Sequence, residues 1–148
     1  MGVIAKVSGH AYDILYDLYI TDERLIAVLI QNPYESVDYR AFSVWKDLFG
    51  GNPFSKRKEQ HNFNLLADER RSKHKSMTPS QLAASHPGNI VFNYDSVASV
   101  EIKTGCMSAR LKIKVINPAF MVRSFGLAKK QAGETRDFLK LVLPSKLK

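Results

Sequence analysis

The sequence predicts an α+β fold that is mainly β, with six or seven short antiparallel strands closed by one C-terminal helix. Two observations support this prediction. Residues 89–125 contain short apolar and alternating runs separated by turn residues, as the strands of a small antiparallel sheet do. Residues 128–143 then carry apolar positions every three or four residues, and Pro144 marks the end of that helical pattern.

The clearest strand signal lies in the second half of the chain. Strands are expected over 98–103, 107–116 and 120–125, preceded by a shorter one that begins near residue 90. In the middle run an apolar set alternates with a polar set, so one face should be buried and the other exposed to water. The apolar set is Met107, Ala109, Leu111, Ile113 and Val115, and the polar set is Ser108, Arg110, Lys112 and Lys114.

The helix that follows is expected to cover this sheet. Its apolar positions are spaced by four, three, four and three residues, which places them on one helical face. The residues of this stripe are Ala128, Ala132, Thr135, Leu139 and Val142, with Phe138 beside them.

The first part of the chain is expected to form a hairpin over residues 12–31. Two β-favouring runs flank the sequence Thr21-Asp22-Glu23-Arg24, where the Asp22 side chain can bond its own backbone in a tight turn. A further short strand is expected near residues 3–7.

Residues 33–87 break the strand pattern with Pro33, Pro53 and paired glycines. Helical segments are expected over 36–48 and 55–72. A short helix should also begin at Thr78, an N-cap residue followed by proline at the first helical position. The prediction is therefore a single domain over 1–148 with a helical insertion at about 33–87.

Composition places the chain among globular proteins. It has 148 residues, 45% of them hydrophobic and 24% charged, and it contains no apolar run of the roughly 20 residues that cross a bilayer. The lone Cys106 is consistent with a reducing compartment. We expect a cytoplasmic protein, with peripheral attachment to the inner face of the membrane as an open alternative.

Positive charge is concentrated in the last third of the chain. The net charge is +8, and residues 101–148, with eleven bases and three acids, account for that whole excess. A basic surface attracts phosphate groups of nucleic acid or lipid, or an acidic patch on a protein. The alternative is that these bases only keep the domain soluble.

The most ordered basic feature is the row Arg110, Lys112 and Lys114. On one strand these side chains project from the same face about 7 Å apart, so they could bind adjacent anionic groups. They are our candidate anionic-ligand site. The alternative is that the lysines protect an exposed strand edge from pairing.

A second feature is an aromatic stripe in residues 39–49, close to helical spacing and followed by a basic run. An amphipathic helix of this kind can lie at a lipid interface, although such a stripe more often packs on its own domain or on a second subunit. The interface or membrane-contact candidates are Phe42, Trp45, Phe49, Lys56, Arg57 and Lys58.

The sequence offers no catalytic constellation, and it implies no cofactor, no metal ion and no small-molecule substrate. Its four histidines lack metal-ligand spacing, and each is expected at the surface. Cys106 has no candidate base beside it and is expected to be inert. The chain is therefore expected not to be an enzyme.

Two strings and the C-terminal elements resemble the pleckstrin-homology-like superfold, including its GRAM and bacterial variants. The strings are YDLYITDERLIAV at 16–28 and FNYDSVASVEIK at 92–103, and the strands and helix of 111–143 complete the pattern. The resemblance implies a bent antiparallel barrel with a helix at one open end. It does not carry phosphoinositide specificity, because the turn at 21–24 has two acids and one base where lipid-binding members place bases.

The resemblance implies a non-enzymatic binding or scaffold module that acts at an acidic surface, either an anionic membrane or a protein partner. The alternative is a nucleic-acid-associated protein that uses the same basic strand. Residues 108–114 contain no aromatic side chain for base stacking, which disfavours nucleic acid. The sequence also leaves open whether the chain forms a homo-oligomer.

Overall fold

The computed structural model describes residues 2–11, 14–32, 53–116 and 121–148, with side chains from residue 64 onward in the first described helix. The helix expected over 36–48 lies outside the described residues. So do all six interface candidates, Phe42, Trp45 and Phe49 by position and Lys56, Arg57 and Lys58 by side chain.

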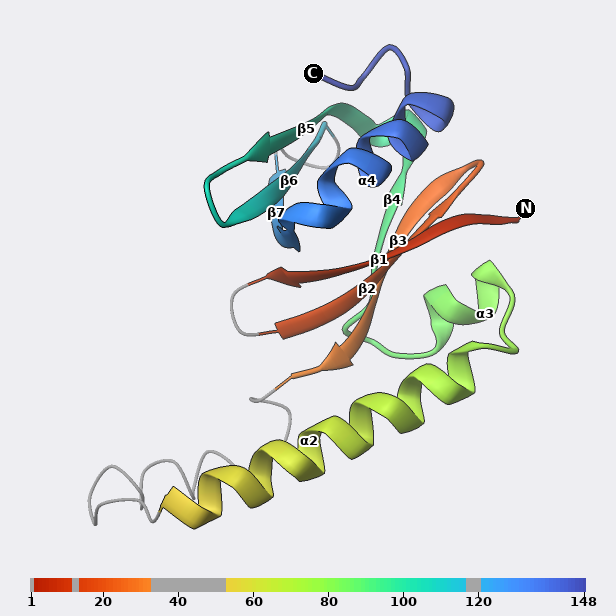
Figure 1. The fold of residues 1–148 in the computed structure, drawn as a ribbon. Helices are drawn as coiled ribbons and strands as arrows, with labels where there is room; N and C mark the ends of the chain where they lie inside the picture. The colour runs from red at the N-terminus through yellow and green to blue at the C-terminus, as the bar shows by residue number, and fades with distance from the viewer. Residues whose placement is uncertain (1, 12–13, 33–52, 117–120) are drawn as a thin grey trace.

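Seven antiparallel strands form one sheet in the order β4-β3-β2-β1-β7-β6-β5 (Figure 1). The α+β, mainly β prediction is therefore confirmed. The strands are β1 (Val3–Ala11), β2 (Ile14–Thr21), β3 (Arg24–Gln31), β4 (Ile90–Asn93), β5 (Val97–Thr104), β6 (Ser108–Val115) and β7 (Met121–Ala128). The helices are α2 (Pro53–His74), α3 (Pro79–Ala84), the 3-10 turn η1 (Tyr94–Ser96) and α4 (Lys129–Val142).

The sheet bends where β1 meets β7. These strands pair only at Gly9 with Leu127 and at His10 with Gly126, whereas β6 and β7 pair at eight positions. Gly9 allows close packing at this crossing, because a Cβ there would lie 3.2 Å from side-chain atoms of both Leu18 and Leu127. Beyond His10 the two strands part, which opens a space between them.

The main core lies between the two parts of the sheet and is closed by α4. Phe125 of β7 is fully buried at its centre, with edge-to-face ring contacts to Tyr16 at 5.7 Å and Phe92 at 6.2 Å between centroids. From α4, Leu139 is fully buried and Thr135 donates a hydrogen bond to the Gln131 carbonyl. The predicted stripe thus faces the sheet, apart from Ala128, which is exposed.

Several predicted details are wrong for identifiable reasons. The first strand extends to Ala11, well beyond residue 7, because it pairs with β2 along its whole length. Met107 is 92% exposed, since β6 begins one residue later and Met107 falls in the turn. In the first hairpin Thr21, and not Asp22, organises the turn. Its hydroxyl accepts from the Arg24 backbone N–H at 3.0 Å and donates to the Arg24 carbonyl at 2.6 Å.

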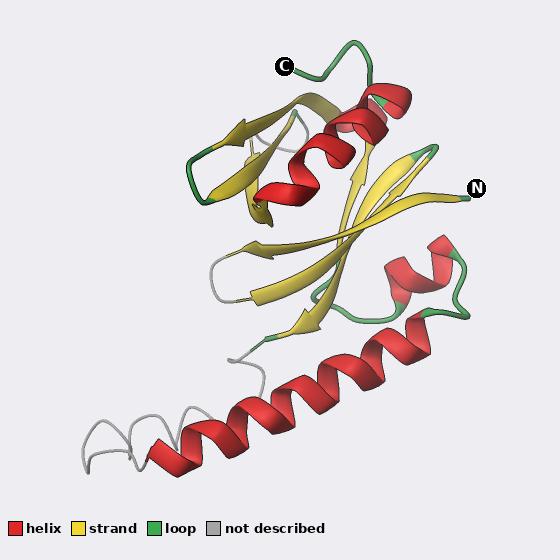
Figure 2. Ribbon diagram, viewed as in Figure 1, coloured by secondary structure: helices red, strands yellow, loops and turns green. Residues whose placement is uncertain are grey.

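Helices α2 and α3 lie on the side of β1–β3 opposite to α4 (Figure 2). Leu82 of α3 is buried against Tyr19, Ile26 and Val28, which form a second apolar cluster on the outer face of β2 and β3. The helices expected over 55–72 and from Thr78 are both present.

A capping box starts α3. The Thr78 hydroxyl accepts from the Gln81 backbone N–H at 3.3 Å, and the Gln81 side chain accepts from the Thr78 N–H at 2.8 Å. Thr78→Ala should therefore lower the free energy of unfolding by about 1 kcal/mol in urea denaturation. Ser72→Ala is the control, because Ser72 is exposed within α2. Equal effects of the two changes would contradict this role for the cap.

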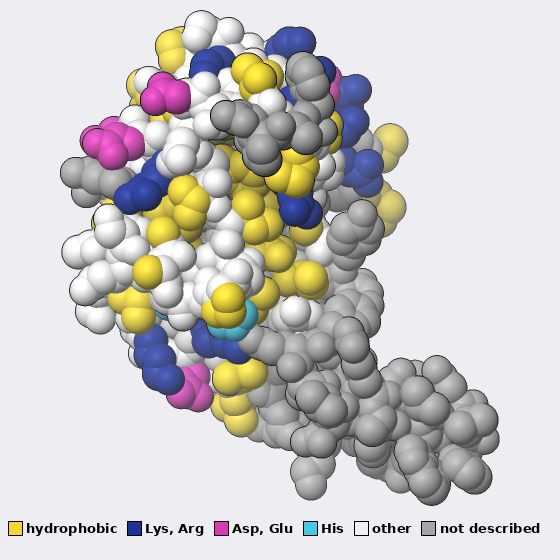
Figure 3. Space-filling view, turned by 180° about the vertical axis from the view of Figure 1, so that it is seen from behind, with side chains coloured by type: hydrophobic (Ala, Val, Ile, Leu, Met, Phe, Trp, Pro, Cys, Tyr) yellow, Lys and Arg dark blue, Asp and Glu magenta, His cyan; other side chains and the backbone are white. Residues whose placement is uncertain are grey.

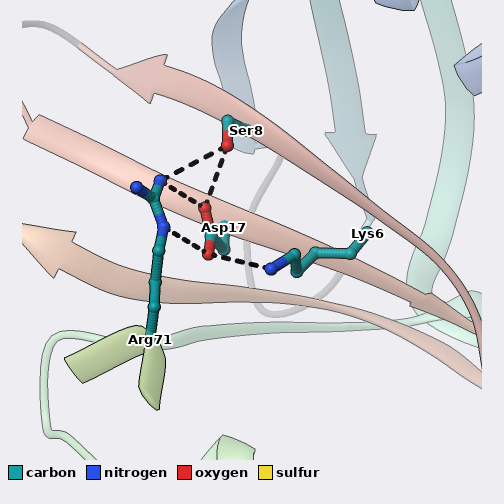
Figure 4. Close-up of polar contacts among 4 residues, drawn as sticks. All are labelled: Lys6, Ser8, Asp17 and Arg71. Atoms are coloured by element: carbon teal, nitrogen blue, oxygen red, sulfur yellow. Dashed lines mark hydrogen bonds and ion pairs between the residues drawn. The ribbon is translucent and has the colours of Figure 1, made fainter. Parts of the chain in front are cut away.

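A polar clasp, defined as Lys6, Ser8, Asp17 and Arg71, attaches α2 to the sheet (Figure 4). Asp17 is fully buried on the outer face of β2. Its carboxylate accepts from Arg71 through Nε at 3.0 Å and Nη2 at 2.9 Å, and from the Ser8 hydroxyl at 3.0 Å. Lys6 Nζ lies 3.8 Å away. The bidentate Arg71 contact and the extra donors supply the hydrogen bonds that a buried carboxylate requires.

Candidate anion-binding site

The predicted basic row lies on β6 as expected. Ala109, Leu111, Ile113 and Val115 are buried on one face of the strand, while Arg110 and Lys114 are exposed and Lys112 is half-buried on the other. The common face of the three cations is therefore confirmed. Their role in binding is a separate question.

Strand β6 lies between β5 and β7 and is not an edge of the sheet. Protection of an edge from pairing therefore does not explain its cations. Three long basic side chains therefore project from one face of a strand that has a neighbour on each side. Their like charges repel one another, and a nearby anion would offset that repulsion.

The neighbouring strands set the charge around this row. On β5, Lys103 stands opposite Arg110, and Glu101 stands opposite Lys112. Glu101 also forms an ion pair with Lys103 at 3.4 Å. The outer face of β5 and β6 therefore carries four cations and one carboxylate, and it remains strongly positive at its Arg110 end.

A cleft of about 540 Å³ opens beside Arg110, where β1 parts from β7. It forms because small residues, Gly126 and Ser124, stand opposite Arg110 and Lys112 on β7 and leave room above the sheet. The cleft is lined by His10, Ala11, Arg110, Val122, Arg123, Ser124 and Gly126.

Two guanidinium groups reach the cleft from different directions. Arg110 projects from the outer face of β6, whereas Arg123 stands opposite Ile113 and so starts from the other face of β7. Among the described residues, neither arginine has a carboxylate within 4 Å. Planar guanidinium groups of this kind suit a phosphate or carboxylate ligand.

Arg123 also acts on the core below the cleft. Burial raises the pKa of the Tyr16 hydroxyl, and the positive charge of Arg123 partly offsets that rise. The positive charge of Arg123 therefore acts on the Tyr16 hydroxyl as well as in the cleft.

Apolar side chains lie toward the other end of the β6–β7 pair, where Val115 stands opposite Met121. Ile116, Met121 and Val122 are 52%, 40% and 55% exposed. Val122 lines the cleft and stands directly opposite Lys114. Figure 3 shows Lys and Arg side chains gathered beside hydrophobic ones at the upper right, in the β5–β7 part of the molecule. Exposed apolar groups next to cations are typical of surfaces that meet a lipid interface.

Sequence reasoning found Arg110 but missed Arg123 and His10. His10 joins the cleft through the pairing of β1 with β7, which brings together positions more than a hundred residues apart. Arg123 joins it through the pairing of β6 with β7. Arg123 gave only a weak signal in the sequence, because it does not belong to the alternating row of Arg110, Lys112 and Lys114.

The histidines are not all surface residues. His10 is exposed in the cleft, and the His86 ring accepts from the Gly88 backbone N–H at 2.9 Å. His74 is 7% exposed, so its predicted surface position is wrong: the residue faces the sheet at the end of α2. Cys106 is a free, exposed thiol in the turn between β5 and β6.

Within the described ranges, no three His, Cys, Asp or Glu side chains gather as a metal site would require. The helices that the structure describes are also too short or too polar to pass through a bilayer.

Comparison of the chain with protein-family models, with curated proteins and with solved structures finds no match.

Proposed function

We propose that the chain is a non-enzymatic, pleckstrin-homology-like binding module that docks on an anionic lipid surface through the cleft between β1 and β7. The observation that carries this proposal is the convergence of Arg110 and Arg123 on one open cleft. Two guanidinium groups without a described carboxylate partner provide strong, directional donors for a phosphate-bearing head group.

The fold assignment is supported by topology. The strand order, the bend at β1 and β7, and α4 packed against the core are all expected of a helix-capped barrel. On this assignment α2 and α3 are the helical insertion between β3 and β4. An antiparallel barrel of this kind presents a site at its rim without requiring catalytic groups.

A lipid surface is favoured over other anionic partners by Val122, which lines the cleft, and by its exposed neighbour Met121. Met121 and Val122 are exposed beside Lys114 and Arg123. Such groups can enter the head-group region while the cations contact acidic lipid, which contributes about 1 kcal/mol per cation. Nucleic acid would instead be expected to use exposed aromatic side chains for stacking.

The test is vesicle sedimentation with neutral vesicles and with vesicles that contain phosphatidylserine. Wild type should bind the acidic vesicles alone, and salt should weaken binding because screening shortens the range of the attraction. The double change Arg110→Ser and Arg123→Ser should weaken binding by about 2 kcal/mol, or roughly thirtyfold. The melting temperature should not change, since both side chains lie outside the core.

The matched control removes two charges elsewhere. Lys130→Ser and Lys140→Ser change exposed residues of α4 and should leave binding within about threefold of wild type. Equal weakening in both double variants would show that net charge alone attracts the protein. Absence of vesicle binding, with tight binding to duplex DNA, would favour the nucleic-acid alternative. Absence of both would favour a protein partner.

A further inference from the structure

We propose that the contact between α2 and the sheet is a pH-sensitive clasp: protonation of His74 in mildly acidic solution releases the C-terminal half of α2 while the sheet remains folded. The proposal is independent of the lipid site, because His74 and the clasp residues do not line the cleft. The proposal is based on the contacts that attach α2 to the sheet.

The described contacts of α2, from residue 64 onward, are mainly polar. Among its described side chains, only Ala67 and His74 are buried, and Leu65 and Leu66 are 55% and 41% exposed. Burial of so little apolar surface stabilises the docked helix weakly. The Arg71 side chain, bonded to Asp17 and Ser8, therefore carries much of the attachment.

A second polar contact lies one turn earlier than His74. Arg70 donates from Nη1 to the Ile30 carbonyl at 3.1 Å, at the end of β3. Both arginines hold the same segment of α2 against the sheet, and both are positively charged. The segment is thus docked through two cations, and the buried Asp17 carboxylate accepts hydrogen bonds from one of them, Arg71.

His74 is buried beside this arrangement. Its Nδ1 atom is inaccessible to water and has no hydrogen-bond partner within the described part of the chain. The Asp17 oxygens are already engaged by Arg71 and Ser8. A proton added to His74 would place a third cation next to Arg70 and Lys6 in a site with little solvent.

The electrostatics agree with this geometry. Burial lowers the pKa of His74, Asp17 opposes that change, and Arg70 and Lys6 add to it. Tyr19 is the other titratable group at the clasp. Burial and the nearby Asp17 raise its pKa, so it stays neutral throughout the acidic range.

The sign of the pH effect follows from the lowered pKa. Above the ordinary histidine pKa of 6.5 the imidazole is neutral whether α2 is docked or released, so docking is at full strength. As pH falls below that value, the released helix takes up a proton that the docked helix resists. The release equilibrium should therefore rise by up to about tenfold per pH unit, until the pKa of the docked state is reached.

Hydrogen–deuterium exchange of the full chain tests the proposal at several pH values between 5 and 8, with rates corrected for intrinsic exchange. Protection of amides 66–74 should fall by up to about tenfold per pH unit below 6.5, while protection of β2 and β3 stays constant. His74→Gln cannot take up the proton and should make α2 protection independent of pH. His61→Gln and His86→Gln should retain the wild-type pH dependence.

Three results would overturn the proposal. One is constant protection of α2 across this range in the wild type. Another is pH dependence that survives in His74→Gln or disappears in either control variant. The third is loss of protection in β2 and β3 together with α2, which would indicate global unfolding. A direct reading needs no variant: the His74 ring should titrate below pH 6.5 by NMR, and titration at or above that value would exclude the proposed mechanism.

Discussion

Phe125→Ala is expected to lower the free energy of unfolding by about 3–5 kcal/mol, the cost of removing a buried aromatic side chain and leaving a cavity. Phe125 is fully buried, and its ring contacts Tyr16 of β2 and Phe92 of β4 across the core. The substitution thus removes packing between the two parts of the bent sheet. Far-UV circular dichroism during urea denaturation measures the change.

The matched control lies three residues earlier on the same strand. Val122 is 55% exposed, so Val122→Ala should change stability by less than about 0.5 kcal/mol. A loss below about 1 kcal/mol in Phe125→Ala would be incompatible with a core centred on this ring.

Leu139→Ala is expected to cost about 2–5 kcal/mol, because Leu139 is fully buried where α4 packs on the sheet. Leu141→Ala makes the same chemical change on the same helix, but Leu141 is 73% exposed. The control should cost less than about 0.5 kcal/mol. Similar urea midpoints for the two variants would show that α4 does not close the core through this face.

The strands could be predicted because their signal is local. The alternation in β6 and the turn near Thr21 depend on neighbouring residues alone, and both are present in the structure. Strand ends were less accurate, because pairing with a neighbour decides where a strand stops. Pairing with β2 extends β1 to Ala11, and pairing with β6 extends β7 to Ala128.

The site could be predicted only in part, for a related reason. Arg110, Lys112 and Lys114 share a face by strand geometry alone. The cleft requires β1 to pair with β7, a contact between distant segments that no local pattern specifies.

The sequence does carry a signal for the clasp. Asp17 interrupts an otherwise apolar strand, and a carboxylate at such a position must find donors when the strand is buried on both faces. The identity of the donor, Arg71, depends on how α2 packs, so that pairing could not be read from sequence.

The proposed function depends on contact between anionic lipid and the surface formed by the cleft and the basic face of β6. Its most direct test is an NMR titration of the isotope-labelled wild-type chain with phosphatidylserine bicelles. Amide shifts should concentrate in residues 110–114 and 121–126, with residues 132–142 of α4 and 17–30 of β2 and β3 unchanged. Shifts confined to α4 or to β2 and β3, or no shifts at all, would contradict the proposed lipid contact.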